Sequence, residues 1–105
     1  ICSEFDQLIY FVLTNESDEK NAYKIANLLL GDKLVRGNIQ ECRIAFLVGG
    51  EINQSKEVQL TIKCKEENID KVCKKISLSH SYEVPEIIYF PVSANENYHH
   101  WVNSF

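Results

Sequence analysis

Hydrophobic residues are spaced in two ways along this chain, and each spacing predicts a different kind of element. Residues 8–13 form an unbroken apolar run, which is typical of a central strand covered on both faces. Residues 58–64 instead alternate strictly between apolar and polar side chains, which is typical of a strand with one buried face. The two stretches therefore predict a β-sheet.

Apolar residues at three- and four-residue spacing predict three helices. The first is capped by Asn15 or Ser17 and is expected to end at Gly31 in a left-handed conformation. The second covers residues 66–77, where acidic residues at the start and lysines near the end complement the helix dipole. The third begins near Asn95, and its apolar stripe, predicted to face the core, consists of Tyr98, Trp101, Val102 and Phe105.

Glycines and prolines mark the limits of the remaining strands. Extended structure over residues 34–39 and 43–48 leads into Gly49-Gly50, a pair that suits a tight hairpin turn. Further on, residues 86–90 carry β-branched and aromatic side chains between Pro85 and Pro91. Because proline cannot donate a ladder hydrogen bond, this stretch predicts a short, fully apolar core strand with a proline at each end.

The order strand, helix, strand, strand, helix, strand and helix predicts an α+β fold. It is the ferredoxin-like split βαβ sandwich, βαββαβ plus a C-terminal helix, with an antiparallel sheet and helices on one face. The length fits a single domain over residues 1–105. One sheet face and two edges are left uncovered, so we expect oligomerisation through the long hairpin.

The net charge and the hydropathy of the sequence restrict the kinds of molecule that this protein is expected to bind. The net charge is −4, from 11 Lys and Arg against 15 Asp and Glu, which argues against a nucleic-acid or membrane partner. Residues 8–13 are far shorter than the roughly 20 residues of a spanning helix, so we expect a soluble, cytoplasmic protein. The sequence begins with Ile1 rather than Met, so we expect residues before it, and whether they include a targeting segment stays open.

The four cysteines lack the spacing of a metal or redox motif. No C-x-x-C pair occurs, so a zinc-ribbon or thioredoxin assignment fails and reduced thiols are expected. Cys64 and Cys73 fall on apolar faces, where a cysteine behaves as a small buried hydrophobe. The cysteines are Cys2, Cys42, Cys64 and Cys73.

Three stretches resemble one protein family. HSYEVPEII at residues 80–88 is similar to the motif H-P-Y-E-x-P-E-I-I of the CutA family of divalent-cation tolerance proteins, departing at Ser81. EVQLTIK at residues 57–63 matches the family's E-V-x-L-x-I-K strand, and Asn95, Tyr98 and Trp101 match its N-x-x-Y-x-x-W ending. The chain departs from the family's pattern at residues 34–39 and 46–50, so it resembles a divergent member.

The resemblance implies a homotrimer of ferredoxin-like subunits whose long hairpins pair between chains. It implies a protein of divalent-metal, and particularly copper, tolerance that acts by binding and assembly rather than as an enzyme. The alternative is a sensor or scaffold, similar to the nitrogen-regulatory PII trimers, with a small ligand or protein at the subunit clefts and no metal role. The family's proposed copper ligands, a cysteine and a histidine pair, fall here at Thr14, Ser79 and His80.

His80 is therefore the first candidate metal ligand, with Glu86 as an added oxygen ligand. We expect no required cofactor and at most weak binding of Cu(II) or another divalent metal, because tight sites need three or four ligands. The alternative is that His80 caps the second helix and hydrogen-bonds locally. His99 and His100 diverge on a helix and are expected to be solvated.

A second candidate set would line a ligand-binding or subunit cleft. It consists of Glu57, Lys63, Tyr82, Glu86 and Trp101. The alternative is an ion-pair and hydrogen-bond network that holds subunits together.

Two other functions are possible for the same fold, but this sequence lacks the residues that each of them requires. An RNA-recognition module needs basic and stacking aromatic residues, whereas the strand 58–64 has no aromatic residue and only Lys63 as a basic one. An acylphosphatase-like enzyme needs a basic, glycine-rich phosphate loop where residues 14–18 read TNESD. No nucleophile and base stand at a recognisable spacing, which favours a protein that is not an enzyme.

Overall fold

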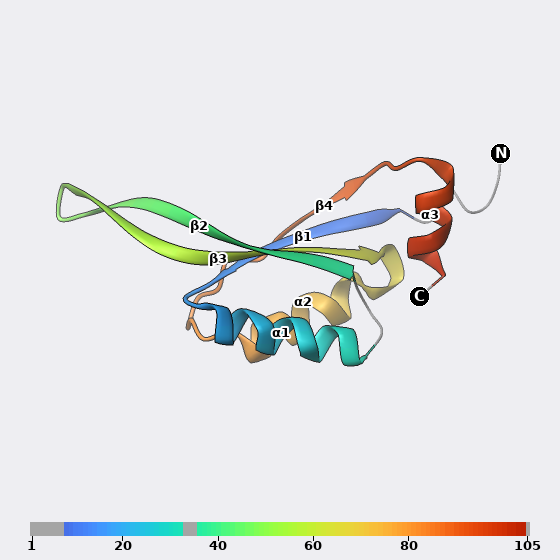
Figure 1. Cartoon of the computed structure of the whole chain (residues 1–105), viewed down its shortest axis with the longest axis horizontal. Coiled ribbons are helices and arrows are strands. Elements are labelled where there is room, and N and C mark those ends of the chain that lie inside the picture. The colour runs from blue at the N-terminus through green and yellow to red at the C-terminus, as the bar shows by residue number, and fades with distance from the viewer. Residues whose placement is uncertain (1–7, 33–35, 105) are drawn as a thin grey trace.

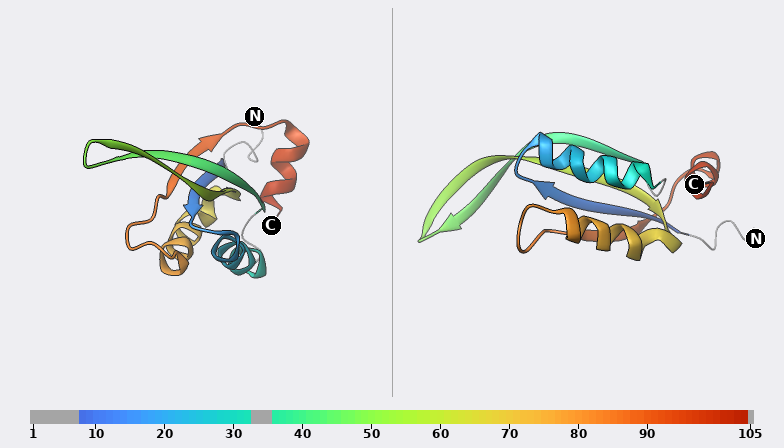
Figure 2. Two further views of the ribbon diagram at one scale, coloured as in Figure 1. Left: turned by 60° about the vertical axis from the view of Figure 1, so that its left-hand side comes forward. Right: turned by 90° about the horizontal axis from the view of Figure 1, so that it is seen from below.

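Four antiparallel strands form one sheet in the order β2-β3-β1-β4. The computed structural model describes residues 8–32 and 36–104. The strands are β1 (Ile9–Glu16), β2 (Arg36–Val48), β3 (Glu51–Lys65) and β4 (Ile88–Val92). The helices are α1 (Glu19–Gly31), the short 3₁₀ helix η2 (Glu66–Asn68), α2 (Ile69–Ser79) and α3 (Glu96–Asn103). Helices α1 and α2 lie side by side on one face of the sheet (Figures 1 and 2), so the predicted ferredoxin-like α+β fold is confirmed.

The core lies between the sheet and these two helices. The alternation predicted for residues 58–64 is present, because every second side chain of this part of β3 is buried under α1 and α2. Full burial of an aliphatic side chain contributes about 1.5–3 kcal/mol each, so this layer supplies most of the packing energy. The buried cluster consists of Val12, Ala22, Ile25, Leu29, Val58, Leu60, Ile62, Cys64, Val72 and Ile76.

Strand β1 is central, as predicted, but it is not covered on both faces. Val12, Thr14 and Glu16 are buried on the helix side, whereas Phe11 and Leu13 on the other side are half-buried. The reason is that α1 and α2 lie on one face only, and α3 shields just one end of the open face. The expectation of a strand buried on both sides was therefore wrong.

Strand β4 is an edge strand, so the prediction of a fully apolar core strand was also wrong. Within residues 8–32 and 36–104 it pairs with β1 alone, and Ile88, Tyr89 and Phe90 are all exposed. Pro91 stands inside the strand, opposite Tyr10, rather than beyond its end. An edge strand tolerates proline because one side of its backbone has no partner to receive an N–H.

The helix ends differ in detail from the prediction. Asp18 caps α1, because its carboxylate accepts the Asn21 N–H at 2.8 Å, while Asn15 belongs to β1. Gly31 lies within α1, and positive φ angles occur among the described glycines only at Gly49 and Gly50, in the predicted hairpin turn. None of the helices in the described part of the chain combines the length and the apolar character needed to cross a membrane.

The β2–β3 hairpin projects as a two-stranded ribbon beyond the rest of the sheet (Figure 1). Strand β1 pairs with β3 only from Val58 to Lys65, yet the pairing of β2 with β3 continues to Val48 and Glu51. This projection makes the molecule 53 Å long against 26 and 20 Å in the other directions. The expected start of β2 at residues 34 and 35 lies outside the described residues.

Candidate functional site

The structure divides the predicted cleft residues between the two ends of the sheet. Glu57, Tyr82 and Glu86 lie together where the ribbon leaves the sheet. Lys63 lies with Trp101 at the other end, where both pack against Tyr98. Glu57 and Lys63 are six residues apart on β3, roughly 20 Å at the rise of a strand. One subunit therefore does not bring all five residues into one cleft.

Glu57, Tyr82 and Glu86 line an open hollow of about 410 Å³. The Tyr82 hydroxyl donates a hydrogen bond to Glu57 Oε2 at 2.5 Å. The rest of the wall comes from Asn15, Ile44, Ala45 and Val84. The hollow is thus lined by both acidic and apolar side chains.

The phenol of Tyr82 is held in its neutral form. Partial burial, the hydrogen bond to Glu57 and the negative charges of Glu57, Glu16 and Asp18 raise the pKa of Tyr82 to about 12. Each of these effects penalises the phenolate. Tyr82 therefore acts as a hydrogen-bond donor in the hollow and not as a general base at neutral pH.

Replacing Glu57 by glutamine is expected to lower the pKa of Tyr82 from about 12 towards its ordinary value of 10. The substitution removes the nearest negative charge, so the phenolate becomes less unfavourable. Ultraviolet titration of the tyrosines in the wild type and the variant measures this change. Glu51→Gln, at the exposed tip of the ribbon, is the matched control, and an unchanged high-pH tyrosine titration in Glu57→Gln would contradict the assignment.

The side chain of His80 is buried, and both of its ring nitrogens have partners within the chain. Nε2 lies 2.6 Å from the Asn15 carbonyl oxygen, which only accepts, so Nε2 carries the proton. Nδ1 accepts the Tyr82 N–H at 3.1 Å. The His80 N–H also donates to the Ile76 carbonyl oxygen and ends α2, as the capping alternative predicted. The ring contact with Asn15, however, reaches across to β1 and is not local.

Glu16 is a fully buried carboxylate beside His80 that the sequence analysis did not identify. It accepts hydrogen bonds from the Ser81 N–H at 2.9 Å, the Ser81 hydroxyl at 2.5 Å and the Ser17 N–H at 3.1 Å. His80 Nδ1 lies 3.5 Å from its Oε2. The signal in the sequence was a carboxylate at an inward position, two residues after Thr14 on a strand with period two. The Glu16–His80–Ser81 network ties the end of β1 to the loop after α2.

The other end of the open face combines cations with aromatic rings. The Arg36 guanidinium carbon lies 4.1 Å from the Trp101 ring centroid, and Lys63 Nζ lies 5.7 Å from that of Tyr98. Trp101 remains 41% exposed, so the predicted core-facing stripe of α3 is correct for Val102 but wrong for Trp101. His99 is buried instead of solvated, because α3 turns it inward with Val102; Phe105 lies outside the described residues.

A family model described as CutA1 divalent ion tolerance protein matches residues 10–104. The chain belongs to this family. The divalent-cation tolerance protein CutA of Pyrococcus horikoshii is 32% identical over 93 residues, 87% of this chain and 91% of that protein. CutA of Pectobacterium atrosepticum is 27% identical over 96 residues, 89% of this chain and 87% of that protein. The crystal structure of CutA1 from Ehrlichia chaffeensis has a TM-score of 0.87 at 28% identity and covers 93% of this chain and 94% of its own.

The CutA resemblance seen in the sequence is thereby confirmed, and the proposed copper positions of the family can be located in this fold. Thr14 is buried on the helix side of β1, and its hydroxyl has no hydrogen-bond partner among the described residues. His80 is not part of the wall of the hollow that Glu86 lines. Among residues 8–32 and 36–104, no group of three or more His, Cys, Asp or Glu residues converges on a point that could hold a metal ion.

Cys64 and Cys73 are poorly suited to bind a metal in place of His80. Cys64 is fully buried in the core, and burial followed by the charge of Cys73 raises the pKa of its thiol to about 12. Burial and then Asp70 raise the pKa of Cys73 as well. A thiol must lose its proton to bind a metal, so both act as the small hydrophobes predicted. Cys42 is half-buried, and Cys2 lies outside the described residues.

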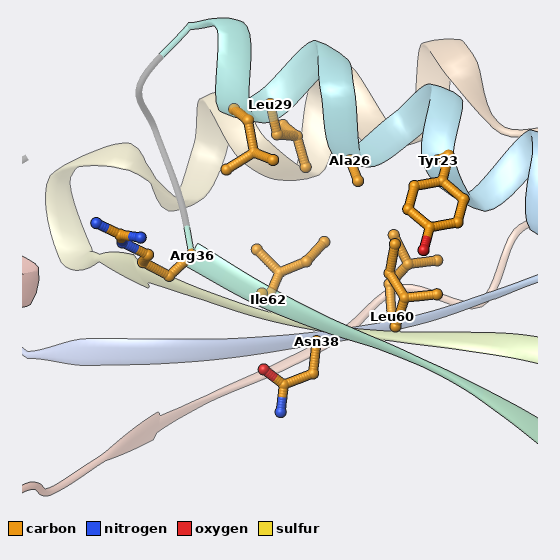
Figure 3. Close-up of a pocket in the computed structure, with 10 residues that line it drawn as sticks. Tyr23, Ala26, Leu29, Arg36, Asn38, Leu60 and Ile62 are labelled. Atoms are coloured by element: carbon orange, nitrogen blue, oxygen red, sulfur yellow. The ribbon is translucent and has the colours of Figure 1, made fainter.

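A second hollow, of about 410 Å³, lies between α1 and the start of β2 (Figure 3). Its walls are mainly apolar side chains, including Ala26, Leu29 and Leu60. Among the described residues that line it there is no carboxylate and no histidine, the side chains that most often bind metals.

Proposed function

We propose that this CutA protein serves divalent-ion tolerance as a homotrimer that binds its ligands without transforming them. The family assignment and the names of its relatives support the role in divalent-ion tolerance. The main structural support for assembly into an oligomer is the projecting ribbon of β2 and β3. The number of three subunits follows from the resemblance to CutA.

The ribbon lacks the cover that a stable element needs. Beyond the end of β1, strands β2 and β3 pair with no other strand of the described part of the chain. An isolated two-stranded hairpin is marginally stable in water. Leu47 and Ile52 near its tip are 71% and 75% exposed, and they are accompanied by the exposed Phe46 and Val48. Apolar patches of this kind mark protein–protein contacts. A second and third copy of the chain would cover them.

Binding without turnover fits the chemistry of the hollow. The Tyr82 phenol is neutral, and the imidazole of His80 is committed at both nitrogens to other groups. General acid–base catalysis requires a group that can exchange a proton near the operating pH and reach the substrate. The carboxylates of Glu57 and Glu86 offer charge and hydrogen-bond acceptors instead.

We further propose that His80 and Glu86 bind copper weakly. A metal ion needs a nitrogen lone pair, but Nδ1 uses its lone pair for the Tyr82 N–H and Nε2 carries a proton for Asn15. One of these hydrogen bonds must be lost when copper binds. This cost supports weak binding, with the remaining ligands supplied by Glu86 or a neighbouring subunit.

A small-ligand sensor is the second candidate function. The Glu57–Tyr82–Glu86 hollow favours it, since it joins convergent polar groups to apolar walls of Ile44, Ala45 and Val84. In this alternative a small ligand or protein binds at the subunit clefts, and metal has no role.

Native mass spectrometry with and without Cu(II) tests the assembly and the metal together. We expect three chains per particle and a small fraction of bound copper, which His80→Ala removes because the imidazole is the nitrogen ligand. His100→Ala, at an exposed histidine of α3, is the matched control and should keep the copper. A persistent monomer would contradict the trimer, whereas equal copper loading of the wild type and His80→Ala would contradict the ligand assignment alone.

A further inference from the structure

The loop of residues 81–87, between α2 and β4, carries two of the polar side chains that line the acidic and apolar hollow, Tyr82 and Glu86. Among the described residues, no backbone–backbone hydrogen bond outside the helices and strands involves this loop. Val84 near its centre is 85% exposed, and only at the far end does Ile87 pack against the core. The start of the loop, where Tyr82 lies, is therefore fixed by contacts of side chains.

Ser81 makes these contacts with a single buried carboxylate. Its N–H donates to Glu16 Oε2 at 2.9 Å, and its hydroxyl donates to Oε1 of the same group at 2.5 Å. Glu16 is fully buried and belongs to the central strand β1, so the acceptor is rigid. Hydrogen bonds to an ionised acceptor are roughly twice as strong as those between neutral groups. Because the two bonds use different donors and different oxygens, they hold Ser81 in one orientation.

Tyr82 follows directly and receives its position from this anchor. Its N–H donates to His80 Nδ1 at 3.1 Å, and the two rings pack with their centroids 5.0 Å apart. The backbone of Tyr82 is thus held through both preceding residues. At the end of its side chain, the hydroxyl donates to Glu57 Oε2 at 2.5 Å. Hydrogen bonds weaken steeply with misalignment, so the placement of the Tyr82 backbone decides whether this bond forms.

We propose that Ser81 is the positioning residue of the hollow: its two bonds to Glu16 place the Tyr82 hydroxyl against Glu57. The inference rests on the second candidate function, in which the hollow binds a small ligand. Polar groups that are fixed before binding lose less conformational entropy when a ligand arrives, so the anchor increases affinity. The anchor is particular to this chain, because the CutA motif has proline at this position, and proline has neither an N–H nor a hydroxyl.

Nuclear magnetic resonance of the tyrosine rings tests the placement directly. The chain carries five tyrosines, so the protein labelled with carbon-13 at tyrosine Cζ gives few resonances, and Tyr82→Phe identifies the one from Tyr82. Cζ bears the hydroxyl, and its chemical shift therefore responds to the hydrogen bond that the hydroxyl makes. Glu57→Ala removes the acceptor and defines the shift of Tyr82 without this bond.

The Tyr82 resonance of Ser81→Pro is expected to move to its position in Glu57→Ala, since both donors to Glu16 are lost. His80 has φ −68° and ψ 143°, a conformation that residues before proline adopt, so this substitution does not strain His80. Ser81→Ala loses the hydroxyl alone and should show a smaller displacement in the same direction. Ser81→Thr keeps both donors and should give the wild-type shift. Ser77→Ala, at an exposed serine of α2, is the matched control and should leave the resonance in place.

An unchanged Tyr82 resonance in folded Ser81→Pro and Ser81→Ala would overturn the positioning role, even if both variants unfolded more easily. The bonds to Glu16 would then stabilise the loop without placing the phenol. An equal displacement in Ser77→Ala would overturn it as well. Circular dichroism checks the folding of each variant, and if Ser81→Pro does not fold, the comparison of Ser81→Ala with Ser81→Thr decides. The measurement contains no ligand, so a failure of ligand binding in the hollow would leave its result unchanged and is distinguishable from a failure of the positioning role.

Discussion

Replacing Leu47 and Ile52 together by lysine is expected to convert the proposed trimer into a folded monomer. The two residues are directly paired near the tip of the ribbon and are the most exposed apolar side chains there. Covering each one in an interface is worth about 1.5–3 kcal/mol, and a trimer contains six of them. Lysines at the same positions remove this gain and add like-charge repulsion between subunits. Light scattering coupled to gel filtration measures the change in mass.

The monomeric variant should keep its fold. Neither residue belongs to the buried cluster under α1 and α2, so circular dichroism of the lysine variant should match that of the wild type. Leu47→Met with Ile52→Val is the matched control, because it retains apolar side chains and should leave the proposed trimer intact. A lysine double variant that still runs as a trimer would show that the ribbon tip is outside the subunit interface.

Most of the fold could be predicted because the spacing of apolar residues reflects which side chains of the sheet are covered by the helices. The alternation over residues 58–64 placed β3, and Gly49-Gly50 placed the hairpin, since both depend on local backbone geometry. The position of β4 could not be predicted in this way. Ile88, Tyr89 and Phe90 have the composition of a core strand, but they lie at an edge, and only the order of strands in the sheet decides that.

The sequence identified most residues of the candidate site, but it could not predict which of them lie together in the fold. The CutA-like motif drew attention to Glu57 and Tyr82, and the structure joins them by a hydrogen bond. Lys63 and Glu57 lie far apart because β3 is extended between them. Matching residues to a family motif does not reveal this distance. Glu16 was missed because it belongs to none of the matched motifs, and its hydrogen bonds to Ser81 join positions 65 residues apart in the sequence.

Replacing Glu16 by alanine is expected to destabilise each subunit by about 3–5 kcal/mol, because several hydrogen-bond donors lose the charged acceptor that they share. The carboxylate is fully buried and accepts three hydrogen bonds, two from Ser81 and one from Ser17. Without it these donors lose their acceptor inside the protein, at about 1–3 kcal/mol for each that stays dry. Urea unfolding at one fixed subunit concentration measures the loss, since oligomer stability depends on concentration.

Glu19→Ala provides the matched control for this prediction. Glu19 is an exposed carboxylate in the first turn of α1, where its interaction with the helix dipole is worth only about 0.3–1 kcal/mol. Both substitutions remove one glutamate, and the two sites lie within four residues of each other. The difference between their losses of unfolding free energy therefore reports the effect of burial and not the loss of a negative charge. If Glu16→Ala cost no more than Glu19→Ala, the hydrogen bonds of Glu16 to Ser17 and Ser81 would not stabilise the attachment of β1 to the loop after α2.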